Sequence, residues 1–396
     1  MKEKIANNSL FPWLLVLYEV VIYLSMDAYM PAFPMIARTF GISANITQLT
    51  ATVWILGGLA VQLIFGPLSD RYGRRPILLF SGVLYVFSTI LCAFATGIHI
   101  FLIARFFQGM AMPAMFIAGY AAINEYFDSK EAIRILALMQ SVTILAPAVG
   151  PMLGGAMLLF VNWRWIFILL AIWSCLMVIA LFFNMPETLP VQKRTNRIHL
   201  GEIIKQYKTV LFNLTFIMYA LTMFLPIIGL VAWILVGPFL VVDHFHYSTL
   251  DYGMIQAFIF ASYILGTKLV RKYASDHRNH LLINLGLSCS FIGVIAAVLI
   301  AYLLPNGLFY LIGSIMMILL GSGIAMPILN RLTLETSDAP MGVRVTIFSV
   351  IRMGSGFLGT ICVPLFYNGT LLSTALIMFV FILIAVVLRI FTLCFA

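Results

Sequence analysis

Apolar segments of about 20 residues or more follow one another along the whole chain, separated by short clusters of charged residues, proline and glycine. A helix of that length crosses a bilayer, because its backbone polar groups are satisfied within the segment. Composition agrees: 63% of the 396 residues are hydrophobic and 9% are charged, against about 25% charged in a soluble domain. The sequence therefore excludes a large soluble domain and predicts an all-α membrane protein with about twelve transmembrane helices.

Charge clusters, proline and glycine set the expected limits of each transmembrane segment. We expect spans at residues 11–36, 46–68, 76–95, 98–122, 134–161, 163–185, 209–241, 250–271, 280–303, 307–331, 342–366 and 370–394. The first and seventh are longer than a bilayer requires and contain proline, namely Pro31 and Pro34 in the first and Pro226 and Pro238 in the seventh. Proline removes a helical hydrogen bond, so both spans should be kinked.

Lysine and arginine concentrate in alternate loops, which predicts the orientation. With a cytoplasmic N-terminus, most of the 23 basic residues fall on cytoplasmic segments, including Lys2, Lys4, Lys193, Arg194 and Arg197. The exceptions are Arg38 and Arg164 on the outer side, and Arg105 and Arg352 inside spans. We therefore expect both termini in the cytoplasm. The net charge of +9 is explained by these loops, and no nucleic-acid partner is expected.

The longest hydrophilic segment divides the spans into two sets of six. It predicts an N-terminal half at residues 1–185, a cytoplasmic linker at 186–208 and a C-terminal half at 209–396. The charged segment at 66–76 has a weak echo at 266–280. Two parallel halves are a common layout of membrane transporters.

Two acidic residues, Glu19 and Asp27, lie deep inside the first span. An ionisable side chain there costs on the order of 2.5–3.5 kcal/mol, so it indicates function. Eight residues apart on a helix, the two are separated by about 12 Å along the axis and can line one cavity at different depths. Burial disfavours the charged form of a carboxyl group, a property that proton exchange requires.

Two arginines also lie inside predicted spans. Arg105 is on the fourth span, which crosses the membrane in the opposite direction to the first, and Arg352 is on the eleventh, which crosses in the same direction. Arg105 should lie about 20 Å from the cytoplasmic surface, close to the depth of Asp27 at about 22 Å. Arg352 should lie near the midplane and face an anion, which is either one of the two acids or the substrate. A purely structural pairing of these charges is the alternative, although a buried ion pair often stabilises less than apolar packing.

Several apolar and aromatic side chains inside the spans are candidates for lining a binding pocket, whereas the cysteines are expected to serve only in helix packing. We add Tyr23, Met139, Trp233 and Phe260 to the candidate binding residues. The five cysteines lie in apolar stretches without paired spacing, and we expect small packing residues rather than disulfides or metal ligands: Cys92, Cys175, Cys289, Cys362 and Cys394.

Three motifs carry a resemblance to the major facilitator superfamily. After the second span, residues 66–76 read GPLSDRYGRRP, a tight glycine turn in which Asp70 lies among arginines. The fourth span contains Arg105 followed by Gln108 and Gly109, and the fifth reads APAVGPMLGG at 146–155. These resemble the signature loop, the proton-coupling arginine motif and the antiporter motif of the superfamily. The conformational residues implied are Gly66, Asp70, Arg71, Gly73, Arg74, Gln108, Gly109, Pro147, Gly150, Pro151, Gly154 and Gly155.

The first span, with LYE at 17–19 and MDAYMPAFP at 26–34, is similar to that of the superfamily's multidrug–proton antiporters and bicyclomycin-resistance exporters. The resemblance implies twelve spans and multidrug efflux across a bacterial inner membrane, coupled to inward proton flow. Glu19 and Asp27 would then be the protonatable acids and Arg105 the coupling arginine. The implied partners are a small-molecule substrate, protons and the lipid bilayer, with the protein as a monomer.

We therefore expect a secondary active exporter rather than an enzyme, without cofactor or metal. No phosphate-cradling loop occurs, which argues against an ATP-driven pump. One alternative is an exporter of an endogenous metabolite such as a siderophore. A second is a membrane sensor or scaffold that transports nothing, although such a protein would not need buried acids.

Overall fold

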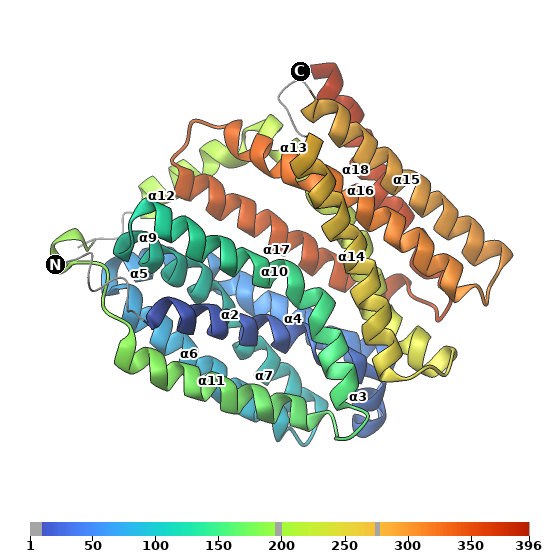
Figure 1. Ribbon diagram of the computed structural model, residues 1–396, viewed down its shortest axis with the longest axis horizontal. Helices are drawn as coiled ribbons and strands as arrows, with labels where there is room; N and C mark the ends of the chain where they lie inside the picture. The colour runs from blue at the N-terminus through green and yellow to red at the C-terminus, as the bar shows by residue number, and fades with distance from the viewer. Residues whose placement is uncertain (1–9, 195–199, 274–277, 396) are drawn as a thin grey trace. The chain divides into compact units, whose positions relative to one another are not determined.

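The computed structural model describes residues 10–194, 200–273 and 278–395, which fold into helices joined by short segments (Figure 1). The topology residues Lys2, Lys4 and Arg197 lie outside the described residues, as does the Cys394 side chain. The all-α fold class is confirmed.

The chain divides into two compact units, Met1–His199 and Leu200–Ala396. The boundary falls within the segment 186–208 that we predicted as a linker, of which residues 195–199 are outside the described part. The assignment of 1–185 and 209–396 as functional halves stays a prediction.

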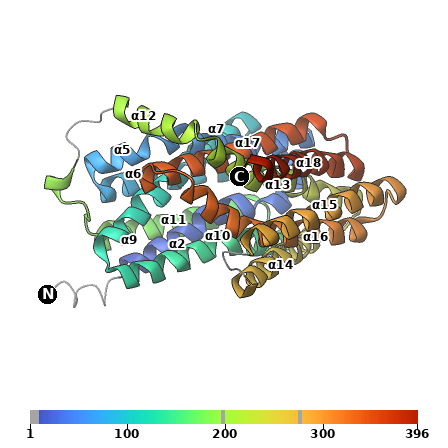
Figure 2. The ribbon, with the colours of Figure 1, turned by 90° about the horizontal axis from the view of Figure 1, so that it is seen from above.

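Helices make up both units. In chain order the first contains α2 (Phe11–Asp27), η1 (Met30–Ala32), α3 (Phe33–Phe40), α4 (Ala44–Gln62), α5 (Phe65–Tyr72), α6 (Arg74–Ala93), α7 (Ile98–Met110), α8 (Met112–Ala114), η2 (Met115–Gly119), α9 (Tyr120–Tyr126), α10 (Ser129–Met157), α11 (Arg164–Asn184) and η3 (Val191–Lys193). The second contains α12 (Leu200–Leu211), α13 (Leu214–Pro238), η4 (Phe239–His244), α14 (Thr249–Tyr273), α15 (Asn279–Leu303), α16 (Leu308–Glu335), α17 (Met341–Phe366) and α18 (Leu371–Phe395). Helices α15 and α16 lie side by side in both views (Figure 2).

Eleven helical segments of the described chain are long and apolar enough to cross a membrane, or up to twelve if the bent helix α10 counts as one span. Their limits lie close to the predicted ones, and two of the differences follow from neighbouring helices. The second span ends at Gln62 instead of reaching residue 68, because α5 begins a separate charged helix at Phe65. The last part of the predicted linker forms a separate helix, α12, which ends at Leu211. The seventh span therefore starts at Leu214 rather than at residue 209.

Proline shapes three spans in different ways. In the first, α2 ends at Asp27, Pro31 lies in the 3-10 turn η1, and Pro34 is in the first turn of α3. In the seventh, Pro226 lies within α13 without interrupting it. In the fifth, α10 bends by 47° between Thr143 and Leu145. Pro147 has no N–H to donate to the carbonyl of Thr143, which explains a bend at that point.

Glycines bring neighbouring helices into backbone contact in the first unit. A Cβ at Gly57 of α4 would collide with the carbonyl of Phe106 on α7, and one at Gly109 of α7 would collide with the carbonyl of Trp54 on α4. In a bilayer the hydrophobic effect does not drive helices together, so helices associate through close packing, which small residues at the crossing allow. The motif glycine Gly109 therefore holds the α4–α7 crossing together.

We predict that Gly109→Ala destabilises the protein. The added methyl group would meet the Trp54 backbone, which cannot rotate away, and overpacking of this kind costs typically 1–3 kcal/mol. The melting temperature of the purified protein, followed by intrinsic fluorescence, should fall.

Gly313→Ala is the matched control. Gly313 is an exposed helical glycine of α16 with nothing within 4 Å of an added Cβ, so its melting temperature should stay unchanged or rise. Equal melting temperatures for the two variants would contradict the crossing role of Gly109.

Candidate functional site

Arg105 is fully buried in the middle of the first unit. Its Nη1 donates to the carbonyl of Ser25 at 2.9 Å and to the side-chain oxygen of Gln108. Its Nε donates to the carbonyl of Thr50 at 3.4 Å. The guanidinium thus connects α7, on which it lies, with α2 and α4.

Aromatic and sulfur groups complete the surroundings of this cation. The guanidinium carbon lies 4.2 Å from the centre of the Tyr29 ring and 5.8 Å from that of Trp54. Its Nη2 contacts the Met26 sulfur at 3.7 Å. Within the described residues, no carboxylate forms an ion pair with Arg105. The charge is therefore compensated by carbonyl dipoles and ring faces.

A second layer of hydrogen bonds orients the groups around Arg105. Gln108 donates to the hydroxyl of Thr89 at 2.8 Å, and the hydroxyls of Tyr29 and Thr50 are 3.1 Å apart. Because an arginine can only donate, the Gln108 oxygen must face it and the amide nitrogen must point to Thr89. Sequence reasoning identified Gln108 but missed Thr89, Tyr29 and Thr50.

Glu19 lies on α2 and is completely buried. Its Oε1 accepts from the hydroxyl of Tyr120 at 3.0 Å and from that of Thr143 at 3.4 Å. Its Oε2 is buried and has no hydrogen-bond partner. A buried carboxylate oxygen without a partner is costly, so this position is suited to a proton or to a donor group of a ligand.

Asp27 is the last residue of α2 and is 7% exposed. It packs against the antiporter-type motif of α10, since a Cβ at Gly150 would meet the Asp27 Cβ at 2.6 Å and one at Gly154 would collide with the carbonyl of Ala28. No salt bridge of Asp27 occurs in the described part of the chain. Both buried acids therefore border α10 and both are without an ion-pair partner there.

Two further candidate residues, Tyr23 and Met139, lie near the partners of Glu19 in the first unit. Tyr23 meets the ring of Phe116 edge to face at 5.9 Å, and Phe116 lies 5.4 Å from the ring of Tyr120, which bonds Glu19. Met139 is fully buried on α10, one helical turn before Thr143. Tyr120 and Thr143 were not among the predicted site residues. The sequence feature that could have identified them is a side chain with a hydroxyl group inside an otherwise apolar span.

The remaining candidates lie in the second unit. Trp233 of α13 is fully buried and donates to Gln256 of α14 at 2.9 Å. Phe260 lies one turn after Gln256 and is partly buried, and Arg352 is partly buried near the middle of α17. The pocket-lining role of Met139, Trp233 and Phe260 stays a prediction.

The signature segment forms a charge cluster around Arg74 rather than a simple loop. The glycine turn that we predicted within 66–76 lies at Gly73, whose φ is +105°, whereas Gly66 lies inside the helix α5. The Arg74 side chain, 10% exposed, pairs with Asp70 at 2.6 Å and with Glu125 at 2.9 Å. Glu125 also accepts from the hydroxyl of Thr188 at 2.7 Å, so it is both the ion-pair partner of Arg74 and a hydrogen-bond acceptor.

A glutamate that the sequence analysis did not single out completes this cluster. Glu187 accepts from the backbone N–H of Arg74 at 3.0 Å, at the first residue of α6, and pairs with Arg194 at 3.5 Å. A carboxylate at a helix N-terminus satisfies a free N–H and interacts favourably with the helix dipole. A Cβ at Gly73 would collide with the Glu187 carboxylate, which explains the glycine. Arg71 stacks on Tyr72 at the exposed edge of the segment.

The described part of the first unit thus contains two buried acids without an ion-pair partner, one buried cation and a glycine-rich helix crossing. A family model described as Major Facilitator Superfamily matches residues 15–364. The chain therefore belongs to the Major Facilitator Superfamily and is a multi-pass transporter.

Two curated transporters and one solved structure are similar to this chain. The chain is 33% identical over 359 residues to the chloramphenicol resistance protein CraA of Acinetobacter baumannii, covering 88% of this chain and 84% of the relative. It is 33% identical over 353 residues to the multidrug transporter MdfA of Edwardsiella ictaluri, covering 89% and 85%. In fold it matches a crystal structure of a D-xylose-proton symporter with a TM-score of 0.73 at 15% identity, covering 94% of this chain and 96% of that one.

We predict that Glu125→Gln weakens the first unit. Removing the charge leaves the largely buried Arg74 with Asp70 as its remaining charged partner, and we expect a loss of roughly 1–3 kcal/mol in the free energy of unfolding. The melting temperature of the purified variant should fall accordingly.

Glu335→Gln serves as control, because the Arg331–Glu335 pair is 62% and 55% exposed and an exposed pair contributes about 0–1 kcal/mol. If Glu125→Gln melts no lower than Glu335→Gln, the cluster around Arg74 does not stabilise the unit.

Proposed function

We propose that the protein is a proton-coupled antiporter that exports lipophilic drugs across a bacterial inner membrane, with both termini in the cytoplasm. The observation that carries this proposal is the Glu19 carboxylate, which is fully buried, accepts two hydroxyl donors on one oxygen and has a free second oxygen. A group of this kind can exchange a proton for the cationic or hydrogen-bonding part of a substrate.

Asp27 is the second exchange position in this proposal. It lies where α2 ends, beside Gly150 of the bent helix α10. A change in the bend of α10 would alter the space and the access at Asp27, which would couple protonation to conformation. A proton or a substrate shifts the equilibrium between conformations only by its difference in affinity for them.

Arg105 has a positioning role in this proposal. Its guanidinium binds the carbonyl of Ser25 and the sulfur of Met26, so it fixes the backbone next to Asp27 and raises the positive potential there without forming an ion pair. The relatives named for chloramphenicol resistance and multidrug transport support drugs as the substrate class.

An exporter of an anionic metabolite, such as a siderophore, is the second candidate function. The observation that favours it is Arg352, a partly buried cation in the middle of α17. In the drug-export proposal this charge lowers the affinity for cations, whereas in the metabolite proposal it binds the substrate.

We predict that Glu19→Gln and Asp27→Asn each lower uphill export by about tenfold or more, because a loss of ~1.4 kcal/mol in proton-coupled binding is already a factor of ten. The measurements are drug efflux in cells and substrate-induced proton release from the purified protein over a panel of lipophilic compounds. Expression and melting temperature should stay close to the unmodified protein.

Glu335→Gln is the matched acid control, since Glu335 is exposed and pairs with Arg331 in the preceding turn of α16. It should retain export and proton release. Full proton release and uphill export by the Glu19→Gln, Asp27→Asn double variant would refute the assignment of the proton sites.

We predict that Arg352→Gln raises the affinity for a lipophilic cationic dye by about tenfold, as expected for ~1.4 kcal/mol of relieved like-charge repulsion. Dye binding to the purified protein, measured by fluorescence anisotropy, gives the two dissociation constants. Unchanged or weaker dye binding, together with lost export of an anionic compound, would favour the metabolite exporter.

A further inference from the structure

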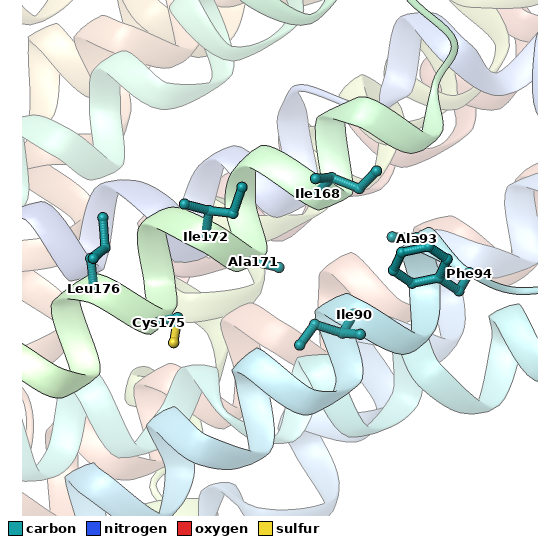
Figure 3. Close-up of a pocket in the computed structure, with 8 residues that line it drawn as sticks. All are labelled: Ile90, Ala93, Phe94, Ile168, Ala171, Ile172, Cys175 and Leu176. Carbon is teal, nitrogen blue, oxygen red and sulfur yellow. The ribbon is translucent and has the colours of Figure 1, made fainter.

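An apolar groove of 380 Å³ runs between α6 and α11 on the surface of the first unit (Figure 3). Two alanines, Ala93 and Ala171, are 1% and 6% exposed and form its floor. The side chains that form its walls are large and exposed: Phe94, directly after the end of α6, is 69% exposed, and Ile172 of α11 is 53% exposed. The groove exists because small residues lie between two rows of large ones.

The two ends of the groove differ. Toward one end α6 and α11 approach closely, since a Cβ at Gly82 would meet the Val178 side chain at 2.6 Å. At the other end Arg164 begins α11, one helical turn before the lining residue Ile168, and its Nη2 donates to the carbonyl of Ala95 at 2.9 Å. The guanidinium therefore bridges α11 to the chain segment that follows α6, at the end of the groove.

Among the described residues, Arg164 has no carboxylate as an ion-pair partner. Its guanidinium lies over the ring of Trp163 at 4.4 Å and 5.9 Å from the ring centre of Phe40. It is partly exposed, and the neighbouring Trp165 is 49% exposed. Tryptophan and arginine at the end of a span are typical of the headgroup level of a bilayer.

We propose that this groove is a phospholipid site, in which an acyl chain lies between α6 and α11 and Arg164 binds the lipid phosphate. A phospholipid combines the two chemistries that the site presents, an apolar chain for the alanine floor and one anionic group for an unpaired, forked donor. Basic pockets between transmembrane helices bind anionic lipid headgroups on the cytoplasmic side of membranes, and the same chemistry applies to a basic residue beside a groove on the outer side. On the predicted topology Arg164 lies on the outer side, where a cation does not help to orient the protein, so lipid binding gives it a role.

Native mass spectrometry of the full chain in detergent tests the site. The protein is titrated with phosphatidylglycerol and with diacylglycerol of the same chains, which has no phosphate. We expect the unmodified protein to bind one phosphatidylglycerol more tightly than diacylglycerol. Arg164→Gln should weaken phosphatidylglycerol binding about fivefold or more and leave diacylglycerol binding unchanged, while Arg164→Lys should retain part of the difference.

A variant that fills the groove distinguishes the contribution of the acyl chain to binding from that of the phosphate. Ala171→Phe should weaken the binding of both lipids, whereas Leu169→Phe, at a 48% exposed position of α11 that does not line the groove, should change neither. Equal phosphatidylglycerol binding by the unmodified protein, Arg164→Gln and Ala171→Phe would overturn the proposal. So would a dimer that Ala171→Phe abolishes without any change in bound lipid, since the groove would then bind a second copy.

A measurement on the unmodified sequence covers the case in which Ala171→Phe does not fold. Cys175 lines the groove, so phosphatidylglycerol should slow its alkylation by a maleimide, with the modified peptide identified by mass spectrometry. Cys289, partly buried on α15 of the second unit, is the internal control. An alkylation rate of Cys175 that phosphatidylglycerol leaves unchanged would refute the acyl-chain position.

Discussion

The solvation of Arg105 is the constraint on which the first unit depends. A charged side chain at the centre of a bilayer costs on the order of 2.5–3.5 kcal/mol on insertion scales, and hydrogen bonds to a charged group return about 1.5–3 kcal/mol each. Arg105 donates such bonds to the carbonyls of Ser25 and Thr50 and to the side-chain oxygen of Gln108. Three helices must therefore meet at one point, and the glycine contacts between α4 and α7 allow them to approach closely enough.

This solution has a consequence for the acids. Since carbonyl oxygens and ring faces compensate Arg105, neither Glu19 nor Asp27 is needed to neutralise it, and no ion pair joins them in the described residues. An acid held in a buried salt bridge exchanges its proton only at the cost of breaking that bridge. Acids that are buried and unpaired can change protonation with less rearrangement, which is what the proposed antiport requires.

Much of the fold was predictable from the sequence, because bilayer thickness fixes the length of a span and charge clusters mark its ends. The buried acids were recognisable for the same reason, as charges inside apolar runs. The partners of Arg105 were not, because backbone carbonyls have no sequence signature. Glu187 was missed since it lies in a polar segment, where an acid is unremarkable until the structure brings it to the N-terminus of α6. The glycine at position 73 likewise makes room for that carboxylate, a long-range contact that the motif alone does not reveal.

The spacing of the two acids limits how they can act. Glu19 and Asp27 are eight residues apart, about 12 Å along the helix axis, so they cannot share one proton as a directly bonded pair does. Their surroundings also differ: Glu19 has hydroxyl donors from Tyr120 and Thr143, whereas Asp27 borders the glycines of α10. The bend of α10 lies between these two contacts in sequence, next to Thr143 and before Gly150. A change in that bend would move Thr143 relative to Gly150, and so would alter the hydrogen bonding of Glu19 and the packing of Asp27 together. In the proposed mechanism this helix, rather than a direct proton transfer, links the two acids.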